Sequence, residues 1–493
     1  MTLRSEPAAE YGTLKLFLDN EWKESASEEL GLSFNPATGR VIAKVPFATK
    51  EEVDEAVESA RRGYGKWSKT PITERVKHLF KLKETLENNF EELAVVSTQN
   101  HGKTLAESRG DVRRTIDNVD TAISVAYTLA KGETLDEIAP GIDEFMVRES
   151  LGVFAIVCPF NFPLMIPFWF LPYAIVLGDT VVVKPSEITP LPMQKVADLV
   201  LQEVGLPSGV FNLIHGGKEV VELLISNSGV SGVGFVGSTS AAKQVYKLAG
   251  EHGKRAIVQG GAKNSIVVMP DADLTRSIGS IVGSFFGNSG QRCLAGSNLV
   301  TVGEAHEKAL KSLVTTSTKL KLGPGLEETT EMGPVVTSKA KERILGDIAR
   351  GVGEGAKLVT DGRDAEVLEY PDGFYLGPSI FDDVSPDMKI SKEEMFGPVA
   401  SVVSAKNLDD AIEMINRGTN YGNMACIYTT NGKNAREFRM RVNAGNIGIN
   451  IGVAAPAANF PFGGRRDSFF GVLHSQIDTV DFFTDKKVIV SRW

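Results

Sequence analysis

The sequence predicts an α/β protein built on two mainly parallel sheets that are covered by helices. Between residues 151 and 236, the apolar stretches "LGVFAIV", "TVVVK", "GVFNLI" and "GVGFV" alternate with stretches of helical periodicity. A second series of the same kind begins at "SIVVM", at residue 265, and runs to about residue 457. Continuously apolar strands that are joined by helices form parallel sheets with helices on both faces. The 493 residues exceed one ordinary core, so we expect two or more domains.

The composition indicates a globular protein without a nucleic-acid partner. The formal net charge is −9 and there is no long run of Lys or Arg, whereas a phosphate backbone requires a basic surface. The three cysteines are widely separated, so they form neither a disulfide framework nor a zinc-binding pair. The N-terminal "MTLRSEPAAEYG" lacks the apolar core of a secretory signal. We therefore expect a cytoplasmic protein without a bound metal.

An uncharged stretch from Gly152 to Gly178 is long enough to span a bilayer, but its composition argues against a membrane anchor. It is interrupted by four prolines, Pro159, Pro163, Pro167 and Pro172. Each proline removes an amide donor that lipid could not replace, and no basic cluster flanks the stretch. We expect instead a strand over residues 151–158, a helix that begins near Pro163 and is kinked by the later prolines, and a second strand over residues 180–184.

Three helices are expected before this region. The first, "TKEEVDEAVESARR", begins with a capping-box pattern at Thr49 and Glu52 and has one apolar face made of Val53, Ala56, Val57 and Ala60. A second is expected over residues 73–93, with an apolar face made of Val76, Leu79, Phe80, Leu86 and Phe90. A third is expected over residues 113–130.

A small β arm is expected outside the two series. The alternation of polar and apolar residues in "GIDEFMVRES" predicts a hairpin between residues 132 and 148. The C-terminal "KKVIVSRW" is rich in β-branched residues, and it could pair with this hairpin.

Two candidate binding motifs lie where strands of the first series end. "VVVKPSE" places Lys184 and Glu187 directly after a strand, where ligands of doubly wound sheets bind, so the pair either holds ribose hydroxyls or forms an ordinary solvated loop. "GVGFVG", residues 232–237, matches a dinucleotide fingerprint, but its apolar residues indicate a strand rather than a turn. Gly237 and Ser238 then begin a helix, whose N-terminus either binds an anion or is simply capped.

Cys293 is the strongest candidate for a nucleophile. "NSGQRCLAGSNLV" places it in a loop rich in Gly, Ser and Asn, between a helix and a strand, and the neighbouring Arg292 favours the thiolate. Cys158 and Cys426 lie in apolar runs, as structural cysteines do. The alternative for Cys293 is a small residue tolerated in a turn. A cysteine hydrolase or acyl transferase also stays open, although none of the six histidines lies in a catalytic-looking loop.

Five segments, "PFNFPL", "KPSE", "FVGST", "GQRC" and "EEMFGPV", occur in the order and spacing of the aldehyde dehydrogenase superfamily. The chain resembles this superfamily over essentially its whole length. The resemblance implies a doubly wound NAD-binding domain, an α/β catalytic domain, a small β oligomerisation arm, and a homodimer or homotetramer. The implied boundaries are residues 1–131, 151–259 and 458–475 for the NAD-binding domain, 260–457 for the catalytic domain, and 132–150 with 476–493 for the arm.

The resemblance also implies roles for individual residues. Cys293 attacks the aldehyde carbonyl, and the amide of Asn161 forms the oxyanion hole with the backbone N–H of Cys293. Hydride then passes to the nicotinamide and leaves a thioester on Cys293. The residues implied to bind NAD are Phe160, Lys184, Glu187, Gly237, Ser238, Glu394 and Phe396. Glu187 favours NAD, since a 2′-phosphate would meet its negative charge. Ala242 replaces a second glycine of the pyrophosphate turn.

One departure from the superfamily concerns the fate of the thioester. Most hydrolytic members have a Glu in "ELGGK" that activates water, whereas "VQGGAKN" has Gln259 at that place. An amide cannot act as a general base. Segments such as "CPFNFPLMIP" and "GGAKN" resemble the methylmalonate/malonate-semialdehyde dehydrogenase branch, which transfers the acyl group to coenzyme A and releases CO2.

The substrate of that branch carries a carboxylate, for which arginine is the bidentate partner. Arg292 and Arg114 stand where the branch has its arginines, although Arg114 is otherwise an exposed charge on a helix. The expected function is therefore NAD-dependent oxidation of a semialdehyde with acyl transfer to coenzyme A. The alternative is a hydrolytic NAD(P)-dependent aldehyde dehydrogenase that gives a free acid.

Overall fold

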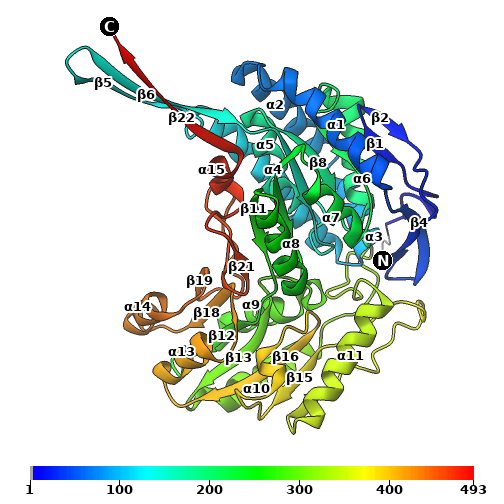
Figure 1. Ribbon diagram of the computed structural model, residues 1–493. Helices are drawn as coiled ribbons and strands as arrows, with labels where there is room; N and C mark the ends of the chain where they lie inside the picture. The colour runs from blue at the N-terminus through cyan, green and yellow to red at the C-terminus, as the bar shows by residue number, and fades with distance from the viewer. Residues whose placement is uncertain (1–3) are drawn as a thin grey trace.

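The structure is a computed structural model that describes residues 4–493, and it contains two large sheets and a projecting arm (Figure 1). The strands of the first sheet are β1 (Leu16–Leu18), β2 (Glu21–Lys23), β7 (Val153–Val157), β8 (Thr180–Lys184), β9 (Phe211–Leu213), β10 (Val230–Val236), β11 (Arg255–Gln259) and β21 (Phe469–Phe470). Their order is β2-β1-β9-β8-β7-β10-β11-β21. The five central strands pair in parallel, and the strands at the edges pair antiparallel.

The second sheet occupies the lower part of Figure 1 and has the order β14-β15-β16-β13-β12-β18-β19. Its strands are β12 (Asn264–Val268), β13 (Gly296–Val302), β14 (Lys357–Thr360), β15 (Ser379–Asp382), β16 (Val399–Ala405), β18 (Met424–Tyr428) and β19 (Asn446–Ile449). All neighbours pair in parallel except β14 and β15. Two parallel sheets in one α/β protein confirm the predicted fold class.

Helices cover both sheets. Around the first are α1 (Lys50–Trp67), α2 (Ile72–Asn88), α3 (Phe90–His101), α4 (Leu105–Tyr127), α5 (Leu171–Leu177), α6 (Leu191–Leu199), α7 (Lys218–Ser226), α8 (Thr239–Glu251) and α15 (Thr479–Phe483). Around the second are α9 (Leu274–Phe286), α10 (Ala305–Ser317), α11 (Ser338–Gly353), α12 (Lys389–Lys392), α13 (Leu408–Arg417) and α14 (Gly432–Arg441). The fold is completed by two short antiparallel pairs, which are β3 (Leu30–Asn35) with β4 (Arg40–Pro46) and β17 (Tyr421–Gly422) with β20 (Arg465–Arg466).

The early helices agree with the sequence in part. The capping box of Thr49 and Glu52 begins α1, and all four residues of its predicted face are buried. The single helix expected over residues 73–93 is wrong, because the chain leaves helical geometry at Asn89 and begins α3 at Phe90. Phe80 is 54% exposed, since the buried face of α2 is centred on Val76, Leu79, Leu82 and Leu86.

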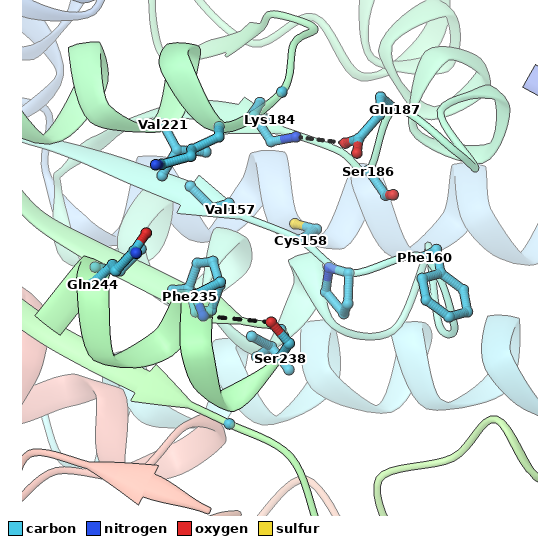
Figure 2. Close-up of a pocket in the computed structure, with 18 of the residues that line it drawn as sticks. Val157, Cys158, Phe160, Lys184, Ser186, Glu187, Val221, Phe235, Ser238 and Gln244 are labelled. Carbon is cyan, nitrogen blue, oxygen red and sulfur yellow. Dashed lines mark hydrogen bonds and ion pairs between the residues drawn. The ribbon is translucent and has the colours of Figure 1, made fainter. Parts of the chain in front are cut away.

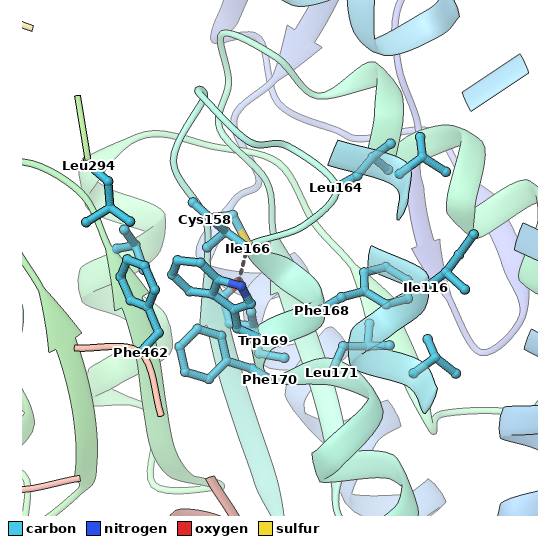
Figure 3. Close-up of a cluster of buried hydrophobic side chains, with 14 of the residues drawn as sticks. Ile116, Cys158, Leu164, Ile166, Phe168, Trp169, Phe170, Leu171, Leu294 and Phe462 are labelled. Atoms are coloured by element: carbon cyan, nitrogen blue, oxygen red, sulfur yellow. Dashed lines mark hydrogen bonds between the residues drawn. The ribbon is translucent and has the colours of Figure 1, made fainter. Parts of the chain in front are cut away.

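The uncharged stretch contains a buried strand, β7, followed by turns and short helices. The expected helix start near Pro163 is wrong, because residues 161–166 form turns and a 3₁₀ turn at Pro167–Trp169 comes first. Pro167 and Pro172 lie in the first turns of short helices, where a missing N–H costs little, so they begin helices instead of kinking one. Phe168, Trp169 and Phe170 pack into a buried hydrophobic cluster of aromatic and aliphatic side chains (Figure 3). Within residues 4–493, no helix has the length and apolar character to cross a membrane.

The arm projects from the upper part of the molecule and ends at the C-terminus (Figure 1). It consists of β5 (Glu133–Ala139), β6 (Ile142–Ser150) and β22 (Thr484–Arg492). Strand β22 pairs with β6 along its whole length, from Thr484 opposite Ser150 to Arg492 opposite Ile142. The predicted pairing of the C-terminal segment with the hairpin is confirmed. The arm exposes the apolar side chains of Leu135, Ile138, Val488, Val490 and Trp493.

Candidate active site

A cavity of about 1000 Å³ is lined by residues from both sheet regions. Most of its wall comes from segments that follow the carboxyl ends of β7, β8, β9, β10 and β11, where doubly wound sheets bind their ligands. Opposite them lie residues of the second region. The structure brings together in this cavity all seven residues predicted to bind the cofactor, which are Phe160, Lys184, Glu187, Gly237, Ser238, Glu394 and Phe396. Cys293 and Asn161 line it as well.

Lys184 and Glu187 form one wall of the cavity (Figure 2). The ammonium of Lys184 is buried and donates to the backbone oxygen of Gly216 at 2.7 Å, and it lies 3.3 Å from the carboxylate of Glu187. Glu187 remains more than one-third exposed. Its carboxylate therefore has free acceptor capacity towards a ligand in the cavity, while Lys184 holds the loop in place.

The strand end at Gly237 and the helix α8 form the facing wall. Gly232 and Gly234 lie inside β10, where a side chain would meet the rings of Phe154 and Phe170, so the apparent fingerprint is a strand as predicted. Ser238 caps α8, its hydroxyl accepting from the N–H of Ala241 (Figure 2). The N-terminus of α8 thus faces the cavity with a capped first turn.

Cys293 lies in a loop between α9 and β13, as predicted. The loop reverses direction through Asn288 and Ser289, both in the left-handed region at φ 53° and 50°. Burial is the main cause that raises the pKa of the Cys293 thiol to about 12, and the charge of Glu394 acts in the same direction. Backbone N–H groups and Arg292 oppose this rise. Additional positive charge or hydrogen-bond donors near the sulfur would favour the thiolate.

Two amides that the sequence did not indicate hold the backbone of Cys293. Its carbonyl oxygen accepts from Asn264 at 2.9 Å and from Asn423 at 2.8 Å. Asn264 also donates to the oxygen of Ala295 at 2.7 Å. Nothing in the sequence could have identified these residues, because Asn264 begins β12 and Asn423 directly precedes β18, and the two meet at the loop only in the fold.

Asn161 is buried at the turn after β7, beside the Cys293 loop. Its side-chain amide donates to the backbone oxygen of Gln291 at 3.1 Å. Gln291 precedes Cys293 by two residues in the same loop, and Asn161 and Cys293 line the same cavity. The role of the Asn161 amide as an oxyanion donor stays a prediction.

A second cavity, of about 70 Å³, also reaches Cys293. Its wall combines the two predicted arginines with apolar side chains that include Phe162, Met165, Trp169 and Phe462. Arg114 is half-buried and donates to the oxygen of Pro456 at 3.1 Å, so it is not a freely exposed helix charge. Arg292 donates to the carboxylate of Glu107 at 2.8 Å.

Glu394 and Gln259 differ in their relation to the cavities. Glu394 lines the large cavity and accepts from the N–H of Ala262 at 2.8 Å, and burial raises its pKa to about 7. Gln259 is buried, and its amide donates to the hydroxyl of Ser475 at 3.0 Å. The residues that line the two cavities do not include Gln259.

No histidine is among the residues that line either cavity, which removes the geometric basis for a cysteine–histidine hydrolase at Cys293. Within the described part of the chain, no cluster of three or more His, Cys, Asp or Glu residues could hold a metal ion.

The class of protein follows from this combination of fold and site. The chain matches the model of the aldehyde dehydrogenase family over residues 22–489. It belongs to that family and is an enzyme.

Among its relatives are malonate-semialdehyde dehydrogenases. Malonate-semialdehyde dehydrogenase 2 of Geobacillus kaustophilus is 45% identical, with 98% of this chain and 99% of the relative covered. The malonate-semialdehyde dehydrogenase of Halalkalibacterium halodurans is 44% identical, with 97% and 98% covered.

Solved structures give the same picture. The methylmalonate-semialdehyde dehydrogenase of Oceanimonas doudoroffii superposes with a TM-score of 0.95 at 38% identity, covering 98% of this chain and 99% of the other. A Sinorhizobium meliloti protein assigned as a methylmalonate-semialdehyde dehydrogenase, crystallised with NAD, has a TM-score of 0.96 at 39% identity, with 98% of both chains covered. The predicted family and branch are confirmed.

Proposed function

We propose that this enzyme oxidises a carboxylate-bearing semialdehyde of the malonate or methylmalonate type with NAD, and transfers the acyl group to coenzyme A with loss of CO2. One observation carries the substrate class. The small cavity at Cys293 contains Arg114 and Arg292 in a wall that is mostly apolar and also includes the amides of Asn118 and Gln476. Guanidinium groups next to the nucleophile are suited to a substrate that carries its own carboxylate. The names of the relatives support the same class.

The large cavity fits NAD. Its volume of about 1000 Å³ accommodates a dinucleotide, and the free acceptor of Glu187 suits ribose hydroxyls better than a 2′-phosphate. A side chain at Gly261 would collide with the Glu394 carboxylate. The glycine therefore keeps open the part of the cavity that Glu394 and Cys293 line. Phe160 and Phe396, whose rings pack edge to face at 5.8 Å, form an apolar wall there. Bound NAD supplies the hydride acceptor.

The residues of the chain account for the acylation half of the reaction. The Cys293 sulfur bonds to the aldehyde carbon, and negative charge develops on the carbonyl oxygen. The amide of Asn161 and the backbone N–H of Cys293 stabilise this charge, an effect of ~3–4 kcal/mol for one preorganised donor. Asn264 and Asn423 both donate to the carbonyl oxygen of Cys293 and so restrain the loop that carries the thiol. Loss of hydride from the carbon leaves an acyl thioester on Cys293.

The second half needs a nucleophile other than water. Gln259 cannot remove a proton from water, and its amide is already bonded to Ser475. The thiol of coenzyme A attacks the thioester carbonyl, the bond to the Cys293 sulfur breaks, and the acyl group leaves as acyl-CoA. The carboxyl group β to the thioester carbonyl is lost as CO2, and a proton replaces it.

The decisive experiment follows NADH formation from malonate semialdehyde with and without coenzyme A and identifies the product by mass. We expect turnover to depend on coenzyme A and to yield an acyl-CoA shortened by CO2. Equal rates without coenzyme A and a free acid as product would instead identify a hydrolytic enzyme.

The same family relationship supports three further inferences. We infer that residues 1–131, 151–259 and 458–475 form the NAD-binding domain and that residues 260–457 form the catalytic domain, since the two large sheets divide in this way. The exposed apolar side chains of the arm suit contact with further copies in a homodimer or homotetramer. Three free cysteines suit the reducing cytoplasm.

A further inference from the structure

A buried ion pair contacts the turn that carries Asn161. Lys103, between α3 and α4, and Asp111, on α4, both have fully buried side chains, and the ammonium lies 3.2 Å from the carboxylate. Burial lowers the pKa of Lys103 and raises the pKa of Asp111. Each residue therefore depends on the charge of the other to remain charged itself. A pair of this kind contributes little to stability, because the loss of hydration offsets the attraction. Its position therefore calls for another explanation.

Both members of the pair also form hydrogen bonds with the segment of residues 158–166, which we call the oxyanion loop. Lys103 donates to the backbone oxygen of Asn161 at 2.7 Å, and its ammonium lies 4.4 Å from the centre of the Phe162 ring. Asp111 accepts from the N–H of Met165 at 2.8 Å. The loop contains no charged residue and no regular secondary structure, so these bonds tie it to α4 at two points.

The same end of α4 also holds the nucleophile loop. Glu107, in the first turn of α4, accepts from Arg292 at 2.8 Å and from the N–H of Asn288. Asn288 in turn donates to the oxygens of Gln291 at 3.1 Å and Asn161 at 3.4 Å. The start of α4 is therefore a common support for the loop that carries Asn161 and the loop that carries Cys293.

We propose that Lys103 and Asp111 are positioning residues that fix the amide of Asn161 relative to Cys293 for aldehyde oxidation. The inference rests on the oxyanion role of Asn161 given above. An oxyanion donor lowers the barrier only if it is already oriented when the charge develops, and misplacement by about 1 Å costs about 10²-fold in rate. The ammonium of Lys103 bonds the very peptide from which the Asn161 side chain extends.

The test uses Lys103→Met together with Asp111→Asn. The double variant removes the bond to Asn161 without leaving one buried charge unpaired, and the side-chain oxygen that D111N keeps can still accept from the N–H of Met165. We expect the rate of NADH formation in the first turnover to fall up to about 10²-fold. The KM for the aldehyde and the affinity for NAD should change about twofold or less, because neither ligand contacts the pair. A double variant with the wild-type first-turnover rate would refute the inference.

A double-mutant cycle with Asn161→Ala separates positioning from general support. If Lys103 and Asp111 act through Asn161, their replacement in the N161A background should lower the rate by only about twofold. If their replacement lowered the rate in the N161A background by the same factor as in the wild-type background, the proposal would be overturned. N161A alone must also slow the first turnover strongly; if it did not, the assigned oxyanion role would fail, and the positioning role with it.

Asp179→Asn is the matched control. Asp179 is another fully buried carboxylate, and it accepts two backbone N–H groups, from Leu151 at 2.6 Å and from Gly152 at 2.7 Å, at the opposite end of β7. D179N should lower thermal stability and leave the first-turnover rate unchanged. An equal loss of rate in D179N would mean that destabilisation, rather than positioning, explains the effect of the Lys103 and Asp111 variants.

Discussion

The two cavities that meet at Cys293 are built in different ways. Most of the wall of the large cavity comes from the ends of neighbouring parallel strands and from the segments that follow them, including α7 and α8, and the second region closes the opposite side. The small cavity is walled by side chains from α4, the oxyanion loop with the nearby Trp169, the Cys293 loop and residues 453–476. The first uses a feature common to doubly wound sheets, whereas the second exists only because four distant segments converge.

This difference indicates which properties each cavity controls. A cavity made from strand ends and backbone groups suits one ligand shared by many enzymes. A cavity made from side chains can change its specificity with single substitutions, because no backbone rearrangement is needed. We therefore expect that the fold determines which cofactor is bound and that a few side chains determine which aldehyde is bound. Three measurements test this division.

The largest effect is expected at the residue shared by the two cavities. Cys293→Ala should abolish turnover, because no other group at that place can form the thioester, while NAD binding measured by calorimetric titration should be retained. Cys158→Ala is the matched control: Cys158 also lines the large cavity, but it is fully buried and burial raises its pKa far above the usual range. Turnover in C293A, or its loss in C158A, would contradict the assignment.

An intermediate effect is expected for the arginines of the small cavity. Arg114→Met and Arg292→Met should each lower kcat/KM for malonate semialdehyde by about 10–100-fold, the worth of a hydrogen bond to a charged group. Propanal, which has no carboxylate, should be affected much less by R114M. R292M should also slow propanal in part, because Arg292 bonds Glu107 at 2.8 Å and lowers the pKa of Cys293. Arg113→Met is the control on the same helix, since Arg113 is exposed and pairs with Glu87 at 2.7 Å. Equal losses for both aldehydes would remove the arginines from substrate recognition.

The smallest effect concerns the pH dependence of the large cavity. Because burial raises the pKa of Glu394 to about 7, its side chain is mostly neutral at pH 6 and mostly a carboxylate at pH 8. In the proposed site, the carboxylate would accept hydrogen bonds from ribose hydroxyls and attract the cationic nicotinamide ring. NAD affinity should therefore rise by about tenfold between pH 6 and 8. Glu394→Gln should flatten the profile in calorimetric titrations; an equally steep profile in E394Q would assign the titration to another group.

Local patterns in the sequence predicted most of the secondary structure that carries the large cavity. The capping residues Thr49 and Ser238 begin helices as expected, and β7 and β8 are buried along their whole length, as their apolar runs require. The failures occurred where a tertiary contact outweighed the local pattern. Phe80 fits a helical repeat, yet only packing decides which side of α2 is buried. Pro163 lies in a turn because the oxyanion loop is tied to α4.

The sequence by itself determined the α/β class, and it indicated the proposed nucleophile and, through family resemblance, the residues proposed to bind the cofactor. These depend on short-range periodicity and on motifs of a few residues, and each such pattern can be recognised without knowledge of the rest of the chain. Only the tertiary structure decided that Asn264 and Asn423 hold the Cys293 carbonyl, that Arg114 reaches the small cavity, and that Lys103 and Asp111 support Asn161. The physical reason is that such polar contacts join residues far apart in the chain, and burial alone makes them specific.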